Sequence, residues 1–406
     1  MFDIVPTREF PVMTQISFLG FTRRELRKRR YKKMRQEHDP NALKVHVFRD
    51  VWFVDDHDRT QHVRDGRMNL SLNGKKFVPA AQTHREWGRP LIKPHPIDPG
   101  QPHSVVDGPL HYLGINFAHY GHFLLETLSR LWPYAGTPVD DRQFLFHSGC
   151  EFDAIREPNR PMLGILGLNN ENLLNLNGKG PVLIRELHVP DPTFVIRTAA
   201  HTFHKRVFDV IREGLGIPGG QTTKQPLYLS RAGYTAGRSA KRQVIGEDIL
   251  EQYLEAAGCR IMRPENHSII EQITAVEQHE TLVGFIGSAL HTVLFASGPR
   301  QVLGLCRQAP NEGYTLGDWV CGNKAVYLYA KDDRPWEGMA LPQGVVLPNL
   351  PAIAEALVSM SPSISPPPIQ PFQEAMHARL MALIESGNIV LEKQQPWITR
   401  MWRRWV

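Results

Sequence analysis

The sequence predicts an α/β protein with a parallel sheet, and the signal is clearest between residues 227 and 305. Short apolar runs alternate there with segments of about ten residues in which apolar side chains recur at helical spacing. Gly258 ends one helical segment, and Ser268 with Glu271 forms a Ser-x-x-Glu capping box that begins the next. Strands and helices that alternate in this way form βαβ units, which build parallel sheets.

The elements expected in this half follow one another closely. We predict strands at residues 227–229, 259–262, 281–285 and 301–305, and helices at 247–257, 268–279 and 290–297. Ligands of parallel sheets bind at the carboxyl ends of the strands. Functional residues are therefore expected just after positions 229 and 285.

The rest of the chain gives weaker signals. Strands are predicted at residues 45–54, 143–146 and 182–189, and Asn73-Gly74 indicates a hairpin turn. A chain of 406 residues is natural for two domains, and the Gly- and Pro-rich residues 216–226 mark the expected boundary. We predict an N-terminal domain (1–215), a C-terminal domain that contains the parallel sheet (216–350), and an extension (351–406) with a Pro-rich linker, a helix at 374–386 and a Trp- and Arg-rich tail.

Residues 284–291 read Gly-Phe-Ile-Gly-Ser-Ala-Leu-His and join a predicted strand to a predicted helix. A Gly-rich turn at a helix N-terminus leaves backbone N–H groups free, and these favour phosphate. Ordinary βα turn chemistry is the alternative, because the spacing is neither GxGxxG nor a Walker loop. Arg231 follows the strand at 227–229, and Arg238, Lys241 and Arg242 come soon after it. A solvated basic loop is the simpler reading of these cations, but beside an anion-binding turn they favour a diphosphate site.

A second group of polar residues lies in the other half of the chain. If residues 119–130 form an α-helix, then His119, His122, Glu126 and Arg130 share an arc of about 80°, opposite a face of leucines. Three interpretations stay open: a catalytic site with a general base, a buried structural network, and a metal site formed by His119, His122 and Glu126.

Charge and cysteine content limit the function classes. The net charge of +6 is concentrated in residues 23–35 and in the C-terminal tail. No nucleic-acid-binding motif accompanies these segments, so they predict contact with an anionic membrane surface or a solvated basic surface. No run of about 18 apolar residues and no signal peptide is found. The four cysteines lack CxxC spacing, which favours reduced thiols and a cytoplasmic protein.

Four blocks together resemble glycosyltransferase family 61, in particular its bacterial members: residues 119–134 (HYGHFLLETLSRLWPY), 227–231 (LYLSR), 244–273 and 284–295 (GFIGSALHTVLF). The resemblance covers about residues 108–305. It implies an inverting enzyme with a GT-B architecture, in which two Rossmann-like domains face a cleft and the C-terminal domain holds a nucleotide sugar. The helix at 119–130 would line the cleft from the acceptor side. The chain departs from many relatives at Gly246-Glu247, where they have Asn-Glu, and in its turn, whose nearest histidine is His291.

We therefore expect an inverting glycosyltransferase, of hexosyl or pentosyl type, that moves a sugar from a nucleoside-diphosphate sugar to a hydroxyl of a surface or exopolysaccharide glycan or a glycolipid. No cofactor, obligatory metal or nucleic acid is expected, and contact with the inner face of the membrane is a further expectation. A metal-dependent hydrolase built on His119, His122 and Glu126, and a non-catalytic nucleotide-sugar binder, are the alternatives. The predicted catalytic residues are His122, Glu126 and Arg130, with His122 and Glu126 as equal candidates for the base, and the predicted donor-binding residues are Ser230, Arg231, Lys241, Arg242, Glu247, Glu265, Gly287, Ser288, Ala289 and His291.

Overall fold

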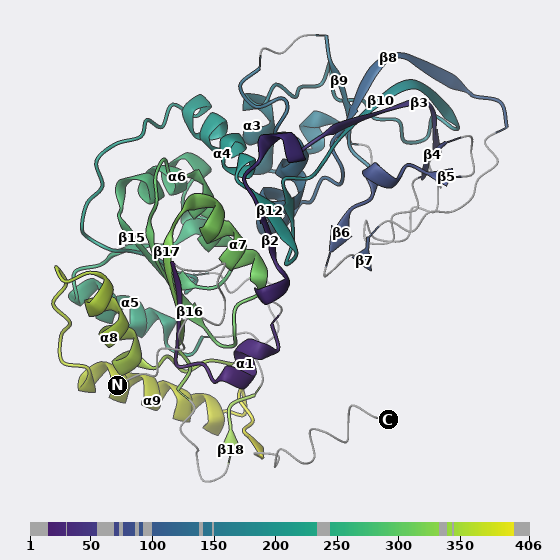
Figure 1. Cartoon of the computed structure of the whole chain (residues 1–406). Coiled ribbons are helices and arrows are strands. Elements are labelled where there is room, and N and C mark those ends of the chain that lie inside the picture. The colour runs from purple at the N-terminus through teal and green to yellow at the C-terminus, as the bar shows by residue number, and fades with distance from the viewer. Residues whose placement is uncertain are drawn as a thin grey trace.

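The computed structural model describes residues 15–29, 31–54, 69–72, 76–85, 89–91, 100–137, 141–147, 150–233, 244–332, 339–342 and 345–393. Figure 1 shows that these residues build two larger sheets that lie apart, with helices on both faces of one of them. The α/β class expected from the sequence is confirmed by this mixture of helices and parallel strands.

Six described strands form a sheet in which every neighbouring pair is parallel. Its order is β1-β17-β16-β15-β13-β14. From β13 onward this is the 2-1-3-4-5 order of a flavodoxin-like doubly wound sheet, whose switch point lies between β13 and β15. The strands are β1 (Ile16–Leu19), β13 (Leu227–Leu229), β14 (Arg260–Met262), β15 (Thr281–Phe285), β16 (Gln301–Cys306) and β17 (Lys324–Tyr329).

Helices cover both faces of this parallel sheet. One face packs on α5 (Glu247–Ala256), α8 (Leu350–Met360) and α9 (Gln370–Glu385). The other packs on α6 (Ile269–Gln278), the 3-10 helix η11 (Ser288–Phe295) and α7 (Glu312–Cys321). The predicted capping box is confirmed, because Ser268 Oγ accepts from Glu271 N and Glu271 Oε2 accepts from Ser268 N at 2.7 Å.

The sheets do not divide the chain at residue 215. Strand β1 comes from the N-terminal end, yet it pairs with β17, and the Phe18 ring stacks on Tyr327 with centroids 5.9 Å apart. Likewise α8 and α9, which we expected in a separate extension, share a core with the parallel sheet. The predicted domain limits took no account of either contact, because neighbours in sequence carry no information about such distant pairings.

The second sheet is mixed, with the order β5-β4-β3-β10-β8-β9. Strand β3 pairs antiparallel with β4 and β10, whereas β8 pairs parallel with β10 and β9. This sheet is therefore not the all-parallel sheet expected of a second Rossmann-like domain, because β3, β4 and β5 form an antiparallel meander. Strands β4 and β5 do pair as a hairpin, although Asn73-Gly74 lies outside the described residues. The bounds are β3 (Val45–Val54), β4 (Asn69–Leu72), β5 (Lys76–Phe77), β8 (Ser104–Tyr112), β9 (Gln143–Leu145) and β10 (Val182–Pro190).

Smaller elements join the two sheets. A three-stranded sheet has the order β11-β12-β2, and α3 and α4 lie near it. Phe208 of α4 packs edge-on against Phe295 of η11, with ring centroids 4.9 Å apart, so one hydrophobic cluster spans both halves of the chain. The remaining main elements are α1 (Arg23–Arg27), β2 (Arg35–Glu37), α3 (Asn159–Ile165), β11 (Phe194–Val195), β12 (Ala199–His201) and α4 (Phe203–Gly214).

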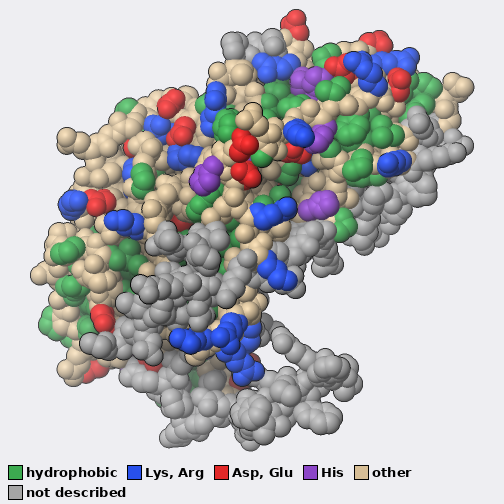
Figure 2. Space-filling view, viewed as in Figure 1, with side chains coloured by type: hydrophobic (Ala, Val, Ile, Leu, Met, Phe, Trp, Pro, Cys, Tyr) green, Lys and Arg blue, Asp and Glu red, His purple; other side chains and the backbone are tan. Residues whose placement is uncertain are grey.

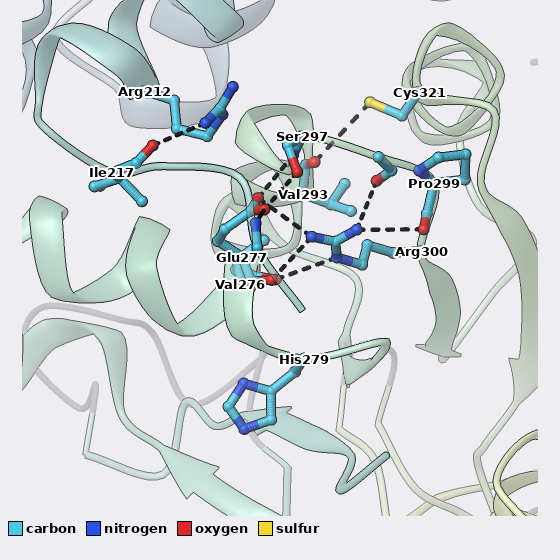
Figure 3. A network of polar contacts seen from close by, with 12 residues as sticks. Arg212, Ile217, Val276, Glu277, His279, Val293, Ser297, Pro299, Arg300 and Cys321 are labelled. Carbon is cyan, nitrogen blue, oxygen red and sulfur yellow. Dashed lines mark hydrogen bonds and ion pairs between the residues drawn. The ribbon is translucent and has the colours of Figure 1, made fainter. Parts of the chain in front are cut away.

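The Gly- and Pro-rich segment 216–226 is tied to the parallel half by a buried polar network, shown in Figure 3. The Glu277 carboxylate pairs with Arg300 at 3.2 Å and accepts from Ser297 N at 2.7 Å. The same carboxylate accepts from Gly220 N at 3.3 Å, and Arg212 donates to Ile217 O at 2.8 Å. The segment therefore contributes two backbone groups, Gly220 N and Ile217 O, to hydrogen bonds with buried charged side chains.

Among the described helices, none is long and apolar enough to cross a membrane. The four cysteines are free thiols, and Cys259, Cys306 and Cys321 are buried.

Candidate active site

The first part of the site is the loop after β13, which carries Arg231. Arg231 N donates to Glu247 Oε1 at 2.9 Å, and Tyr228 OH donates to the same oxygen at 3.1 Å. Burial raises the pKa of the Glu247 carboxyl, although the Arg231 charge opposes that rise. Ser230 is fully buried, and its hydroxyl accepts from Ala232 N at 3.0 Å. Glu247 and Ser230 therefore support the backbone around Arg231, whose own side chain is partly exposed.

The second part is the Gly-rich turn after β15, the strand next to β13. A Cβ placed on Gly287 would lie 3.4 Å from Arg231 Nη1, so the guanidinium packs directly over this glycine. Ser288 and Ala289, which begin η11, are partly exposed on the same edge. The sequence placed Arg231 and this turn at one edge of the sheet, and the pairing of Leu229 with Gly284 bears out that placement. A guanidinium and a glycine turn thus meet at the switch point, where doubly wound sheets bind ligands.

The other predicted donor-binding residues have different surroundings. Glu265 is exposed beyond the end of β14, with its carboxylate against Gly233 of the Arg231 loop. His291 is buried, and its ring stacks on Tyr314 at 4.5 Å with an interplanar angle of 12°. Lys241 and Arg242 lie outside the described residues.

Residues 120–130 form a helical segment that changes its winding twice. The α-helical turn α2 (Tyr120–His122) continues into the π-helical turn η6 (Phe123–Thr127) and the 3-10 turn η7 (Leu128–Arg130). The prediction of a regular α-helix with four polar residues on one face is wrong, because His119 has extended backbone and the π-turn shifts the later side chains. All five residues of η6 are buried, so packing decides the winding. Such π-turns are frequent at functional sites.

His122 and Glu126 remain paired across the π-turn. His122 Nδ1 lies 2.7 Å from Glu126 Oε2, and the exposed fractions of the two side chains are 39% and 5%. An ionised carboxylate accepts hydrogen bonds and does not donate them, so this contact favours the tautomer of His122 with its proton on Nδ1. The His119 ring lies 5.1 Å from the His122 ring. A half-exposed imidazole oriented by a buried carboxylate has the arrangement of a general base.

Arg130 does not join this pair. Its guanidinium donates to Pro190 O and, at 3.0 Å, to Gln82 O, and it lies over the Tyr112 ring at 5.8 Å. Arg130 and Glu126 both line a pocket, together with Phe117, His84 and Phe194. Arg130 therefore anchors the helical segment to β10 and contributes to a pocket wall.

The two parts of the site touch each other through Gly121. A Cβ on Gly121 would lie 3.2 Å from Ser288 Cβ and 3.4 Å from His291 Cδ2. Beside this contact, Tyr120 OH lies 3.2 Å from Thr292 Oγ1. Burial lowers the pKa of His291 to about 3, and the nearby His122 and His119 add to the effect, so His291 is neutral at pH 7. Sequence reasoning did not identify Gly121, Tyr120 or Tyr314, because their roles depend on contacts between distant segments.

Within the part of the chain that the structure describes, no three His, Cys, Asp or Glu side chains are grouped as ligands for a metal ion.

A comparison with protein families matches residues 120–303 to the model described as Glycosyltransferase 61. The matched segment begins in α2 and ends in β16, so it contains both His122–Glu126 and Arg231 with the Gly287 turn. A comparison with curated proteins found no match.

Proposed function

From the premise that this chain belongs to glycosyltransferase family 61, we propose that it transfers a sugar from a nucleoside-diphosphate sugar to a glycan hydroxyl, with inversion at the anomeric carbon. The observation that carries the proposal is the contact of Gly121 with Ser288, which brings the His122–Glu126 pair beside the Arg231 and Gly287 edge. A base for the acceptor and a cation for the leaving group are the two groups that such a transfer requires.

The leaving group is a diphosphate that gains negative charge as the glycosidic bond breaks. The Arg231 guanidinium, held over Gly287, offers a planar fork of donors that suits phosphate oxygens. The free amides at Ser288 and Ala289 add further donors at the start of η11. We propose that these groups bind the donor diphosphate in a GT-B arrangement, in which the half with the mixed sheet supplies the acceptor side.

On the acceptor side, His122 is the proposed base. Nε2 of His122 removes the proton from the acceptor hydroxyl, and the resulting oxygen attacks the anomeric carbon from the face opposite the diphosphate. The bond to the diphosphate breaks, and its electron pair leaves with the diphosphate oxygen. Glu126 holds the ring through Nδ1 and stabilises the imidazolium that forms. The glycan or glycolipid acceptor, and the hexosyl or pentosyl identity of the donor sugar, belong to this proposal.

Two further points complete the proposal. No divalent ion is required, because Arg231 and the turn amides neutralise the diphosphate, so transfer survives EDTA. The protein also contacts the inner face of the membrane through α1, where Figure 2 shows a group of basic side chains, since Arg23, Arg24, Arg27 and Lys28 are exposed. Each basic residue near an anionic surface adds about 1 kcal/mol of attraction.

Nucleotide binding tests the proposal directly. UDP, GDP, ADP, dTDP and CMP are each added near saturation, and thermal unfolding is followed. A ligand at 100 times its dissociation constant stabilises the fold by about 2.7 kcal/mol, so at least one nucleotide should raise the melting temperature by several degrees. Arg231→Ala should remove most of this shift, whereas Arg260→Ala, an exposed arginine at the opposite edge of the same sheet, should keep it. If no nucleotide changes the wild-type curve, the proposal is wrong.

A further inference from the structure

A third strand end reaches the same edge of the parallel sheet, and it carries Arg307. Strand β16 lies beside β15, with Leu305 paired to Phe285, and Ile286 N donates to Leu305 O at 3.0 Å beyond the end of β15. Gly287 lies two residues after Phe285, and Arg307 lies two residues after its partner Leu305. Arg231 follows Leu229 of β13 by two residues as well. Arg231, Gly287 and Arg307 thus leave three adjacent strands at one edge.

Tyr314 of α7 is a common neighbour of the two arginines. Burial raises the pKa of the Tyr314 phenol to about 12, against the charges of both Arg231 and Arg307. The Tyr314 ring also stacks on His291, which touches Gly121. The charges of both arginines therefore act on a ring that packs beside the turn after β15 and near α2.

Two residues near the N-terminus, Arg29 and Tyr31, hold the loop that carries Arg307. Arg29 donates to Ala309 O from Nε at 3.1 Å and from Nη2 at 2.6 Å, and Tyr31 OH donates to Pro310 O at 2.6 Å. Asn311 caps α7 by accepting from Gly313 N at 2.9 Å. A loop fixed by several hydrogen bonds keeps its side chain in a narrow range of positions, and a pre-organised cation loses less entropy when it binds an anion.

We infer that Arg307 is a second donor-binding residue, which grips the diphosphate of the nucleotide sugar from the side opposite Arg231, with the Gly287 turn between them. The inference rests on the proposed function and adds a residue to the donor site. Two planar guanidinium forks on either side of a glycine backbone can bind the oxygens of both phosphates.

The inference is tested with the nucleotide that binds most tightly in the panel above, and with inorganic pyrophosphate as a competitor. Dissociation constants are measured by calorimetry for the wild type, Arg307→Ala, Arg307→Lys, Arg231→Ala and the matched control Arg260→Ala. We expect Arg307→Ala to weaken nucleotide and pyrophosphate binding about 10-fold to 100-fold. Arg307→Lys, which keeps the charge and loses the fork, should give a smaller loss, and Arg260→Ala should give none.

The outcomes separate the inference from the proposed function. If Arg231→Ala weakens binding and Arg307→Ala binds like the wild type, the inference fails and the proposed function stands. If the wild type binds none of the nucleotides, both fail. Melting curves without nucleotide show whether Arg307→Ala folds, and where it does not, Arg307→Lys decides: wild-type affinity for the nucleotide and for pyrophosphate in that variant overturns the inference.

Discussion

The two parts of the proposed active site are built in different ways. The donor side consists of loops that leave adjacent parallel strands, where β13 ends before Arg231 and β15 before Gly287. The acceptor side consists of one helical segment in the hydrophobic core, where a π-turn places a half-exposed His122 over a buried Glu126. Regular topology positions the first side, and a local irregularity positions the second.

This difference predicts which property a substitution on the donor side or on the acceptor side should change. The donor side depends on the close approach of the partly exposed Arg231 guanidinium to Gly287, so changes there should affect nucleotide affinity first. The acceptor side depends on one hydrogen bond between an imidazole and a carboxylate, so changes there should affect the rate of transfer and leave nucleotide affinity unchanged. The predictions below test this separation.

The largest effect is expected for His122→Ala. Loss of a general base commonly lowers the rate by 10²- to 10⁴-fold, and we expect about 10³-fold lower kcat with an unchanged dissociation constant for the donor nucleotide. The matched control is His267→Ala, which removes the histidine of another His–Glu pair at the same sequence spacing, with 3.9 Å between Nδ1 and the carboxylate. A kcat equal to that of the control would show that His122 takes no part in transfer.

A smaller effect is expected for Glu126→Gln, because this change keeps the shape of the side chain and removes the carboxylate that orients His122. We expect kcat to fall about 100-fold, while nucleotide binding and the melting temperature change little. The comparison with His122→Ala identifies the base. A larger loss in Glu126→Gln than in His122→Ala would assign that role to Glu126, which also lines the pocket beside Arg130.

Low pH should destabilise the fold because three histidines are more deeply buried than His122. Burial lowers the pKa of His147 to about 4 and that of His204 and His291 to about 3, whereas an unfolded histidine has a pKa of about 6.5. Below pH 6.5 the unfolded chain therefore binds protons that the folded chain does not. The free energy of unfolding should fall as the pH drops from about 6.5 to 4, by up to about 1.4 kcal/mol per pH unit for each imidazole.

Burial raises the pKa of the Asp318 carboxyl to about 6, so this group opposes the trend between about pH 6 and 4. Urea unfolding at pH 7.5, 6.5, 5.5 and 4.5 measures the slope. In His204→Gln the slope of the free energy of unfolding against pH should be smaller, by the equivalent of about one proton, and kcat should be unchanged. In His122→Ala, by contrast, kcat is expected to fall. A free energy of unfolding that is constant over this range would contradict the prediction.

The smallest effect is expected for Gly287→Ala. The φ angle of −175° suits any residue, so the backbone is not strained, but the new Cβ would lie 3.4 Å from Arg231 Nη1. Because the new methyl group only reaches ordinary contact with the guanidinium and occupies space beside it, nucleotide binding should become no more than about threefold weaker, with kcat unchanged. Gly220→Ala is the control, since a Cβ there meets nothing within 4 Å. Equal affinities in both variants would mean that Arg231 does not depend on this space.

The sequence could predict the donor side because its signals are local. Apolar runs placed β13, β15 and β16 almost to the residue, and parallel strands bring their carboxyl ends to one edge. The placement of Arg231 and the Gly287 turn at one edge follows from that rule, and their contact follows from the pairing of β13 with β15. Arg307 at the end of β16 obeys the same rule, but we did not single it out because no other polar signal accompanies it in the sequence.

The acceptor side could be predicted in part. The spacing of four residues between His122 and Glu126 was sufficient to place them together, since one helical turn separates them. The expected alignment with Arg130 was wrong, because the winding of residues 120–130 depends on five buried side chains that pack against other parts of the chain. The Arg130 guanidinium instead donates hydrogen bonds to the carbonyl groups of Pro190 and Gln82, which are far from it in sequence.

The sequence by itself determined the α/β class, the strands around the switch point, the candidate base pair and the family resemblance, because each of these depends on residues that are near one another in the chain. The tertiary structure alone decided that β1 joins the parallel sheet, that the second sheet is mixed, and that Gly121 touches Ser288. These features depend on contacts between segments that are separated in the chain, and many such contacts are compatible with the same local pattern. Packing of the shared core selects one of them.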